Sequence, residues 1–234
     1  MKIEIWSDVV CPFCYIGKRH LEIALRDSDM LTEVDIEWKS FQLDPGADAY
    51  VGMHLHDYLS KSKGITLEQA QQMSAGVEER GGAVGIDFKF DNAIVANTRL
   101  AHHLLHFAKA KGVQYEMKER LFKAYFIEGK DMNSKEVLLE LAEEMGLDGN
   151  ATSSFIGSDE ADQHFREDLG WAQQFGIRGV PFFVFNRKYA LSGAQPISTF
   201  VEVLEKVKSE EVEQPEVLTS SSEGESCSTD DPNC

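Results

Sequence analysis

Hydrophobic and polar residues alternate in two short stretches near the start of the chain, Lys2–Trp6 and Asp35–Phe41. A period of two is typical of half-buried β-strands. Between these stretches, from Cys14 to about Asp27, the apolar residues follow helical spacing instead. Strand, helix and strand in this order predict a βαβ unit with a right-handed crossover.

The middle of the chain, from about residue 51 to 157, is predicted to be mainly helical. Thr66 and Gln69 have the spacing of a capping box, so a helix is expected to begin there and to end near Gly81. Further helices are expected over residues 96–111, 115–127 and, capped by Asn133, up to Met145. No strand pattern interrupts these segments, which indicates a helical domain inserted into an α/β fold.

The last part of the fold returns to strands. A helix from near Asp159 to Gly176 is followed by a β-type run, Val180–Phe185, with Pro181 at its head, where no ladder N–H is needed. Residues 189–192 are expected to complete a hairpin, and residues 197–207 to form a last amphipathic helix. From Ser209 onward almost nothing can be buried, so residues 209–234 are predicted to be a disordered acidic tail.

Charge and length exclude several classes of function. The 234 residues are enough for one large or two small domains, and their net charge of −17 disfavours nucleic acid and anionic membranes as partners. No apolar run approaches the length of a membrane span. The chain enters a strand at once, without a basic segment followed by an apolar one, which predicts a cytoplasmic protein.

The candidate chemistry lies at the first strand-to-helix junction, in the motif Cys11-Pro12-Phe13-Cys14. The free N–H groups and the dipole of a helix start favour an anion, so we expect a lowered pKa for the Cys11 thiol. The spacing lets Cys14 reach back and resolve a mixed disulfide. Half of a zinc site uses the same spacing, and two buried thiols without a role remain an alternative, but the context favours a redox dithiol.

Three phrases together carry a family resemblance: Ser-Asp-Val-Val-Cys-Pro-Phe-Cys-Tyr-Ile-Gly-Lys, Gly-Val-Pro-Phe-Phe-Val-Phe and Tyr-Ala-Leu-Ser-Gly-Ala-Gln-Pro. Over about residues 1–207 the chain resembles the DsbA-like thioredoxin-fold oxidoreductases, and within them the FrnE-type branch. The resemblance implies an α/β thioredoxin fold with a large inserted helical domain. Its two halves would be residues 1–50 and 158–208, around an insertion of residues 51–157.

The resemblance also implies roles for individual residues. Cys11 would be the nucleophile, Cys14 the resolving thiol and the Val180–Pro181 bond cis, which presents the Val180 backbone to an extended peptide. Pro12 and Phe13 would belong to the same substrate-binding surface.

The implied activity is the exchange of disulfides with client proteins. A cellular thiol reductant would recycle the protein, with no cofactor besides the dithiol and with glutathione as a potential co-substrate. Strongly oxidising relatives usually have His where Phe13 stands, so we expect a potential nearer that of a reductant or isomerase.

Two other functions compete with this interpretation. Kappa-class glutathione transferases and 2-hydroxychromene-2-carboxylate isomerases share the insertion, but they usually carry Ser at the position of Cys11 and leave Cys14 without a role. A redox-regulated, holdase-like binding protein would instead use the helical insertion as an apolar surface.

Two further groups of residues invite chemistry. His102 and His106 have the i, i+4 spacing of metal ligands, but no third ligand is evident, so these residues and His103 are interpreted as ordinary helix residues and no metal site is predicted. Cys227 and Cys234 in the acidic tail are not required by a thioredoxin-type core. They form a candidate auxiliary dithiol that exchanges with the first pair, or they have no role.

Overall fold

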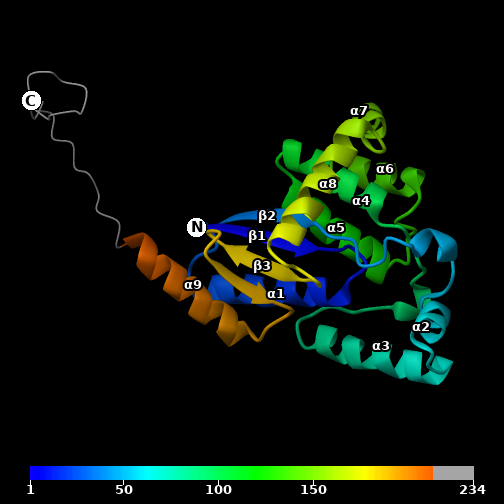
Figure 1. The fold of residues 1–234 in the computed structure, drawn as a ribbon, viewed down its shortest axis with the longest axis horizontal. Helices are drawn as coiled ribbons and strands as arrows, with labels where there is room; N and C mark the ends of the chain where they lie inside the picture. The colour runs from blue at the N-terminus through cyan, green and yellow to red at the C-terminus, as the bar shows by residue number, and fades with distance from the viewer. Residues whose placement is uncertain (213–234) are drawn as a thin grey trace, which may run out of the picture.

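A computed structural model describes residues 1–212, and its centre is a four-stranded mixed sheet (Figure 1). The strand order is β2-β1-β3-β4, with β1 parallel to β2 and antiparallel to β3, and with β3 and β4 forming a hairpin. The bounds are β1 Lys2–Ser7, β2 Asp35–Ser40, β3 Phe182–Phe185 and β4 Tyr189–Ser192. The predicted βαβ unit, closed by α1 (Pro12–Asp27), and the predicted hairpin are confirmed.

Helices cover both faces of this sheet. Ile3 and Ile5 of β1 pack with Phe183 in the core beneath α1 and α9 (Ile197–Val212). Trp6 points to the opposite face, where its indole N–H donates to the Asp168 carbonyl of α8 (Asp159–Gln174) at 3.0 Å. The alternating pattern of β1 therefore separates two buried faces, and does not separate a core from solvent.

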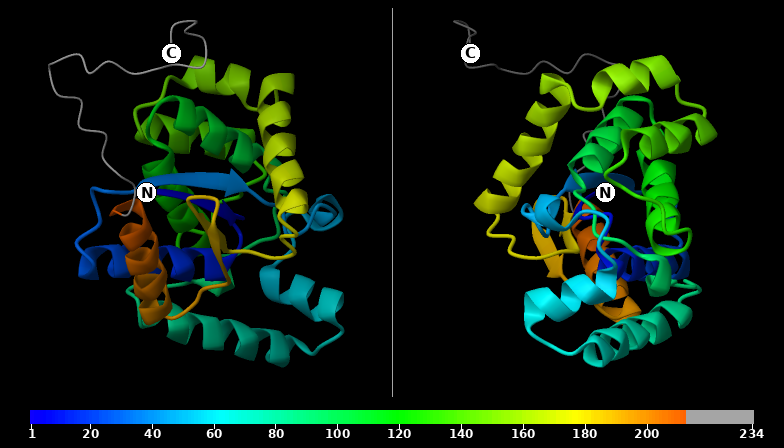
Figure 2. Two further views of the ribbon diagram at one scale, coloured as in Figure 1. Left: turned by 60° about the vertical axis from the view of Figure 1, so that its left-hand side comes forward. Right: turned by 90° about the vertical axis from the view of Figure 1, so that its right-hand side faces the viewer.

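The helical insertion consists of two parts on opposite sides of the sheet, as the views of Figures 1 and 2 agree. The hairpin of α2 (Leu55–Lys63) and α3 (Leu67–Gly82) lies apart from the bundle that packs α4 against α5 and α8. The remaining bounds are α4 Arg99–Ala110, α5 Gln114–Phe126, α6 Lys135–Glu144 and α7 Gly149–Phe155, with short 3-10 turns at Ala47–Tyr50 and Phe90–Asn92. In the part of the chain described, no helix is both long and apolar enough to cross a membrane.

Three expectations about the helices need correction. The cap of α6 is Ser134, whose hydroxyl accepts from the Val137 N–H at 3.2 Å, while the backbone N–H of Asn133 donates to the Asp131 carboxylate at 2.8 Å in the preceding loop. The helices α2 and α7 were not predicted. The last helix runs to Val212, through residues assigned to the disordered tail; the rest of that tail, with Cys227 and Cys234, lies outside the described residues.

The first turns of α1 join the sheet to the helical bundle. Cys11, Cys14 and Tyr15 belong to the large core that contains α4, α5 and α6. Tyr15 stacks on Phe122 of α5 with ring centroids 4.8 Å apart. Glu119 of α5 accepts from both Lys18 (2.8 Å) and Arg19 (2.5 Å) of α1. The inserted bundle is thereby fixed directly behind the Cys-Pro-Phe-Cys motif.

Candidate functional site

The two cysteines of the motif stand where the sequence predicted, at the start of α1. Cys11 is the residue before the first helical turn and has extended backbone angles (φ −92°, ψ 109°), and Pro12 opens the helix. Both thiols are free. Cys11 keeps 3% of its surface exposed, whereas Cys14 is completely buried. Of the two thiols, only Cys11 therefore reaches the surface.

The loop before β3 faces this dithiol. The Val180–Pro181 bond is cis, as expected, and the Cys11 thiol lies 3.6 Å from the Val180 carbonyl oxygen. Gly17 of α1 allows this close approach, because a Cβ there would lie 3.1 Å from Pro181 Cγ and 3.1 Å from Phe183 Cζ. A glycine one turn into α1 thus sets the distance between the dithiol helix and the loop.

The order of the two thiol pKa values is the reverse of the expected one. A hydrogen bond to Cys14 and burial raise the pKa of Cys11 well above its ordinary value. Burial also opposes ionisation of Cys14, but the hydrogen bond from Cys11, the charge of Lys118 and the Ser7 hydroxyl together lower its pKa. Of the two thiols, Cys14 is therefore the one whose ionised form its surroundings favour.

A buried polar cluster behind Cys14 explains this reversal, and sequence reasoning missed its central residue. Lys118 of α5 is fully buried, and burial lowers the pKa of its amine to about 8, against the opposing effect of Cys14 and Asp8. Asp8 accepts from the Leu43 N–H at 2.8 Å and lies 3.4 Å from Nε2 of His102. One signal was available in the sequence, because Lys118 interrupts the apolar face of its helix.

A mostly apolar cleft of about 480 Å³ opens beside the motif. Pro12 and Phe13 form one wall, α2 and α3 the other. Phe13 is 36% exposed and Met73 of α3 is 48% exposed, so both apolar side chains are open to solvent along the cleft. Arg80 of α3 lies over the Phe13 ring, 6.0 Å from its centroid. The two residues between the cysteines thus line an open cleft beside Cys11.

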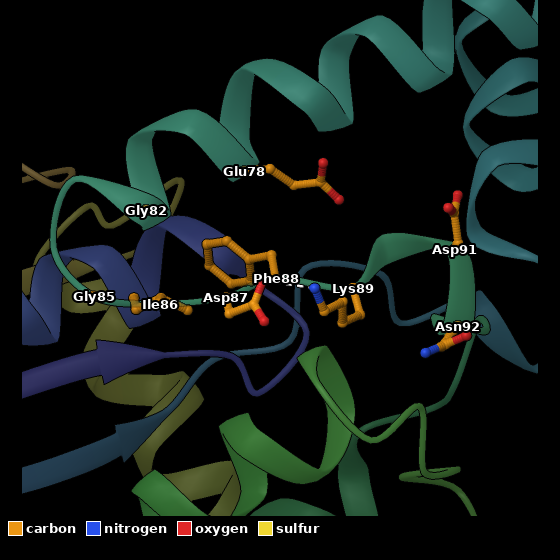
Figure 3. Close-up of a pocket in the computed structure, with 9 residues that line it drawn as sticks. All are labelled: Glu78, Gly82, Gly85, Ile86, Asp87, Phe88, Lys89, Asp91 and Asn92. Carbon is orange, nitrogen blue, oxygen red and sulfur yellow. Dashed lines mark hydrogen bonds and ion pairs between the residues drawn. The ribbon is translucent and has the colours of Figure 1, made fainter.

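A larger hollow, of about 680 Å³, lies elsewhere, between α3 and residues 85–92 (Figure 3). Its walls carry the carboxylates of Glu78, Asp87 and Asp91, and Lys89 is paired with Asp87 at 2.7 Å. No thiol lines it. We therefore place the candidate site at the dithiol and not in this larger hollow.

The three histidines of α4 contact three different carboxylates. His102 approaches Asp8, while Nε2 of His103 lies 3.0 Å from Asp162, and Nε2 of His106 lies 3.4 Å from Asp168. Across residues 1–212 no group of three or more potential ligands is arranged to hold a metal ion.

Comparison with known proteins agrees with this geometry. Residues 2–205 match the model of the DSBA-like thioredoxin domain family. A probable DsbA oxidoreductase from Streptomyces coelicolor is 32% identical, with a TM-score of 0.83 over 98% of this chain and 97% of that one. The Bacillus subtilis (strain 168) protein YwbO is 30% identical over 184 residues, which are 78% of this chain and 85% of YwbO.

More distant structures share the fold alone. The cytosolic disulfide reductase DsbM from Pseudomonas aeruginosa is 19% identical, with a TM-score of 0.65 over 90% of this chain and 100% of that one. A 2-hydroxychromene-2-carboxylate isomerase is 15% identical, with a TM-score of 0.67 over 91% of this chain and 98% of that one. On the match of residues 2–205, and on the placement of the dithiol beside a cis-proline loop, this chain belongs to the DSBA-like thioredoxin domain family.

Proposed function

We propose that this protein is a cytoplasmic thiol–disulfide oxidoreductase that exchanges disulfides with client proteins through Cys11 and Cys14. The observation that carries the proposal is the arrangement of the two thiols. They lie together at a helix start, and the Cys11 thiol, the only one of the two that a client can reach, lies 3.6 Å from the Val180 carbonyl oxygen. A cellular thiol such as glutathione would return the pair to its starting state.

Atoms, charges and electrons balance in the exchange when the reduced pair begins with one proton, on Cys11. As Cys11 attacks a client disulfide, its proton passes to Cys14, a Cys11–client disulfide forms, and one client sulfur leaves as a thiolate. Cys14 then attacks Cys11, the Cys11–client bond breaks, and the second client sulfur leaves with the proton as a thiol. The client disulfide has gained two electrons and the Cys11–Cys14 pair has lost two.

Two features support a peptide as the substrate. The Val180 N–H makes no hydrogen bond to any residue between 1 and 212, and the Val180 carbonyl contacts only the Cys11 thiol, so this backbone is available to an extended chain. The cleft lined by Phe13 and Met73 offers apolar contacts within reach of the same chain. Clients should therefore carry apolar residues near their reactive cysteine.

Trapping of mixed disulfides tests this proposal. In a background with Cys227→Ser and Cys234→Ser, Cys14→Ser should accumulate disulfides between Cys11 and a client that carries a disulfide, because Cys11 attacks the client disulfide and no second thiol resolves the product. Cys11→Ser in the same background should trap almost none. The proposal is wrong if the two variants trap equal amounts, or if Cys14 is the sulfur found in the cross-linked peptides. Conjugation of glutathione to an aromatic electrophile that persists in Cys14→Ser would point to a transferase instead.

A further inference from the structure

Lys118 is buried without any hydrogen-bond partner. Its side chain has no exposed surface, and within the described part of the chain its Nζ donates to no acceptor. Its amine lies over two aromatic rings, with the Phe122 centroid 4.8 Å and the Trp38 centroid 5.3 Å away. Removing an ammonium from water is unfavourable, so a buried one is expected to have a compensating negative charge nearby.

The charges that act on Lys118 come from two elements. The negative charges that favour its protonated form belong to Cys14 and Cys11 at the start of α1 and to Asp8 directly after β1. The Phe122 ring beside the Lys118 amine also stacks on Tyr15, the residue next to Cys14. Asp8 already has partners of its own, the Leu43 N–H and His102 of α4. The dithiol is therefore the neighbour whose charge changes during a redox cycle.

We infer that Lys118 is a positioning residue that stabilises the negative charge of the reduced dithiol and thereby sets the reduction potential of the Cys11–Cys14 pair. The inference rests on the proposed function. In the reduced protein a thiolate compensates the ammonium, while in the disulfide form both sulfurs are neutral and that compensation is lost. Lys118 therefore stabilises the reduced form relative to the disulfide, which makes the pair more oxidising.

This role gives the helical insertion a part in the chemistry. Lys118 lies on α5, and the neighbouring Glu119 binds Lys18 and Arg19 of α1. The contact fixes α5 against the helix that carries Cys14. The positive charge of Lys118 raises the reduction potential of the pair. Phe13, which lacks the cationic character of a histidine between the cysteines, is expected to lower it.

The substitution Lys118→Met tests the inference, because Met retains the unbranched chain and suits an apolar pocket. Thiolate absorbance should show the first pKa of the dithiol raised by about 1 or more, as expected when an opposite charge is removed. In glutathione buffers the oxidation equilibrium constant should rise about tenfold, which corresponds to a potential about 30 mV more negative. Lys123→Met, which removes a half-exposed charge from the same helix, should change neither quantity.

A second measurement needs no variant. In wild-type protein with labelled lysines, the Lys118 amine should titrate at a higher pH in the reduced form than in the disulfide form. Equal titration in both forms, or a folded Lys118→Met variant with unchanged thiolate pKa and potential, would overturn the inference alone. A wild-type protein that forms no Cys11–Cys14 disulfide in any glutathione buffer would overturn the proposed function together with it.

Discussion

Replacing Gly17 with alanine should destabilise the protein and displace the cis-proline loop from the dithiol. An ordinary carbon contact is about 3.5–4.0 Å, so a Cβ at 3.1 Å from both Pro181 Cγ and Phe183 Cζ requires these atoms to move by a few tenths of an ångström. Neither neighbour yields easily. Phe183 is completely buried and makes an edge-on contact with Phe200, with centroids 4.8 Å apart.

Two opposing effects decide the magnitude. Alanine in a helix interior is favoured over glycine by about 0.5–1 kcal/mol, whereas overpacking a rigid core costs about 1–3 kcal/mol. We therefore expect Gly17→Ala to lower the free energy of unfolding by about 1 kcal/mol. The exchange rate with a protein client should fall further than stability alone explains, because the Val180 carbonyl moves away from Cys11.

Urea unfolding of the reduced protein measures the expected loss in free energy of unfolding. Client exchange under pseudo-first-order conditions measures the expected fall in exchange rate. Gly170→Ala is the matched control, since it lies inside α8 with nothing within 4 Å of its added Cβ. That variant should gain stability and keep its exchange rate. If Gly17→Ala were also stabilised, or exchanged as fast as the wild type, the argument from close approach would be wrong.

Three further predictions concern acid stability, the cleft and the tail. Burial lowers the pKa of His103 to about 4 and of His106 to about 3. A histidine in the unfolded chain binds a proton near pH 6.5, whereas these two buried residues do so only at lower pH. Their contribution to the free energy of unfolding is therefore complete above pH 6.5 and falls below it, by about 1.4 kcal/mol per pH unit for each residue. Urea midpoints at pH 7 and 5 should show this loss, and its absence in the wild type would contradict the burial argument. Met73→Gln should slow exchange with an apolar client about fivefold, the equivalent of about 1 kcal/mol of lost apolar contact, but not exchange with oxidised glutathione; equal slowing of both would place the client elsewhere. Truncation after Val212 removes both tail cysteines and should alter turnover with dithiol reductants while leaving the thiolate pKa unchanged, and unchanged turnover would leave those cysteines without a redox role.

Local patterns in the sequence were sufficient for much of the fold. The capping box at Thr66 is formed in full, with Gln69 bonding back to the cap. The strand after Pro181 and its hairpin follow from composition and turn residues alone. Short helices without a long apolar stripe, such as α7, are stabilised by tertiary packing and give no comparable signal. The choice between Asn133 and Ser134 as a cap depended on the loop before them, because both residue types suit the position.

The ionisation of the dithiol could not be predicted in this way, because local and distant groups favour different sulfurs. The helix start, read from the sequence, favours a negative charge near Cys11, but such an effect is worth about 0.3–1 kcal/mol and rarely more than 2 kcal/mol. Cys14 is instead favoured by a hydrogen bond and by an ammonium in a buried environment, where each charge-assisted bond contributes about 1.5–3 kcal/mol. The ammonium belongs to Lys118, which is more than a hundred residues away in the chain. Only the packing of α5 against α1 brings that charge to Cys14, so the site's chemistry depends on the insertion as much as on the motif.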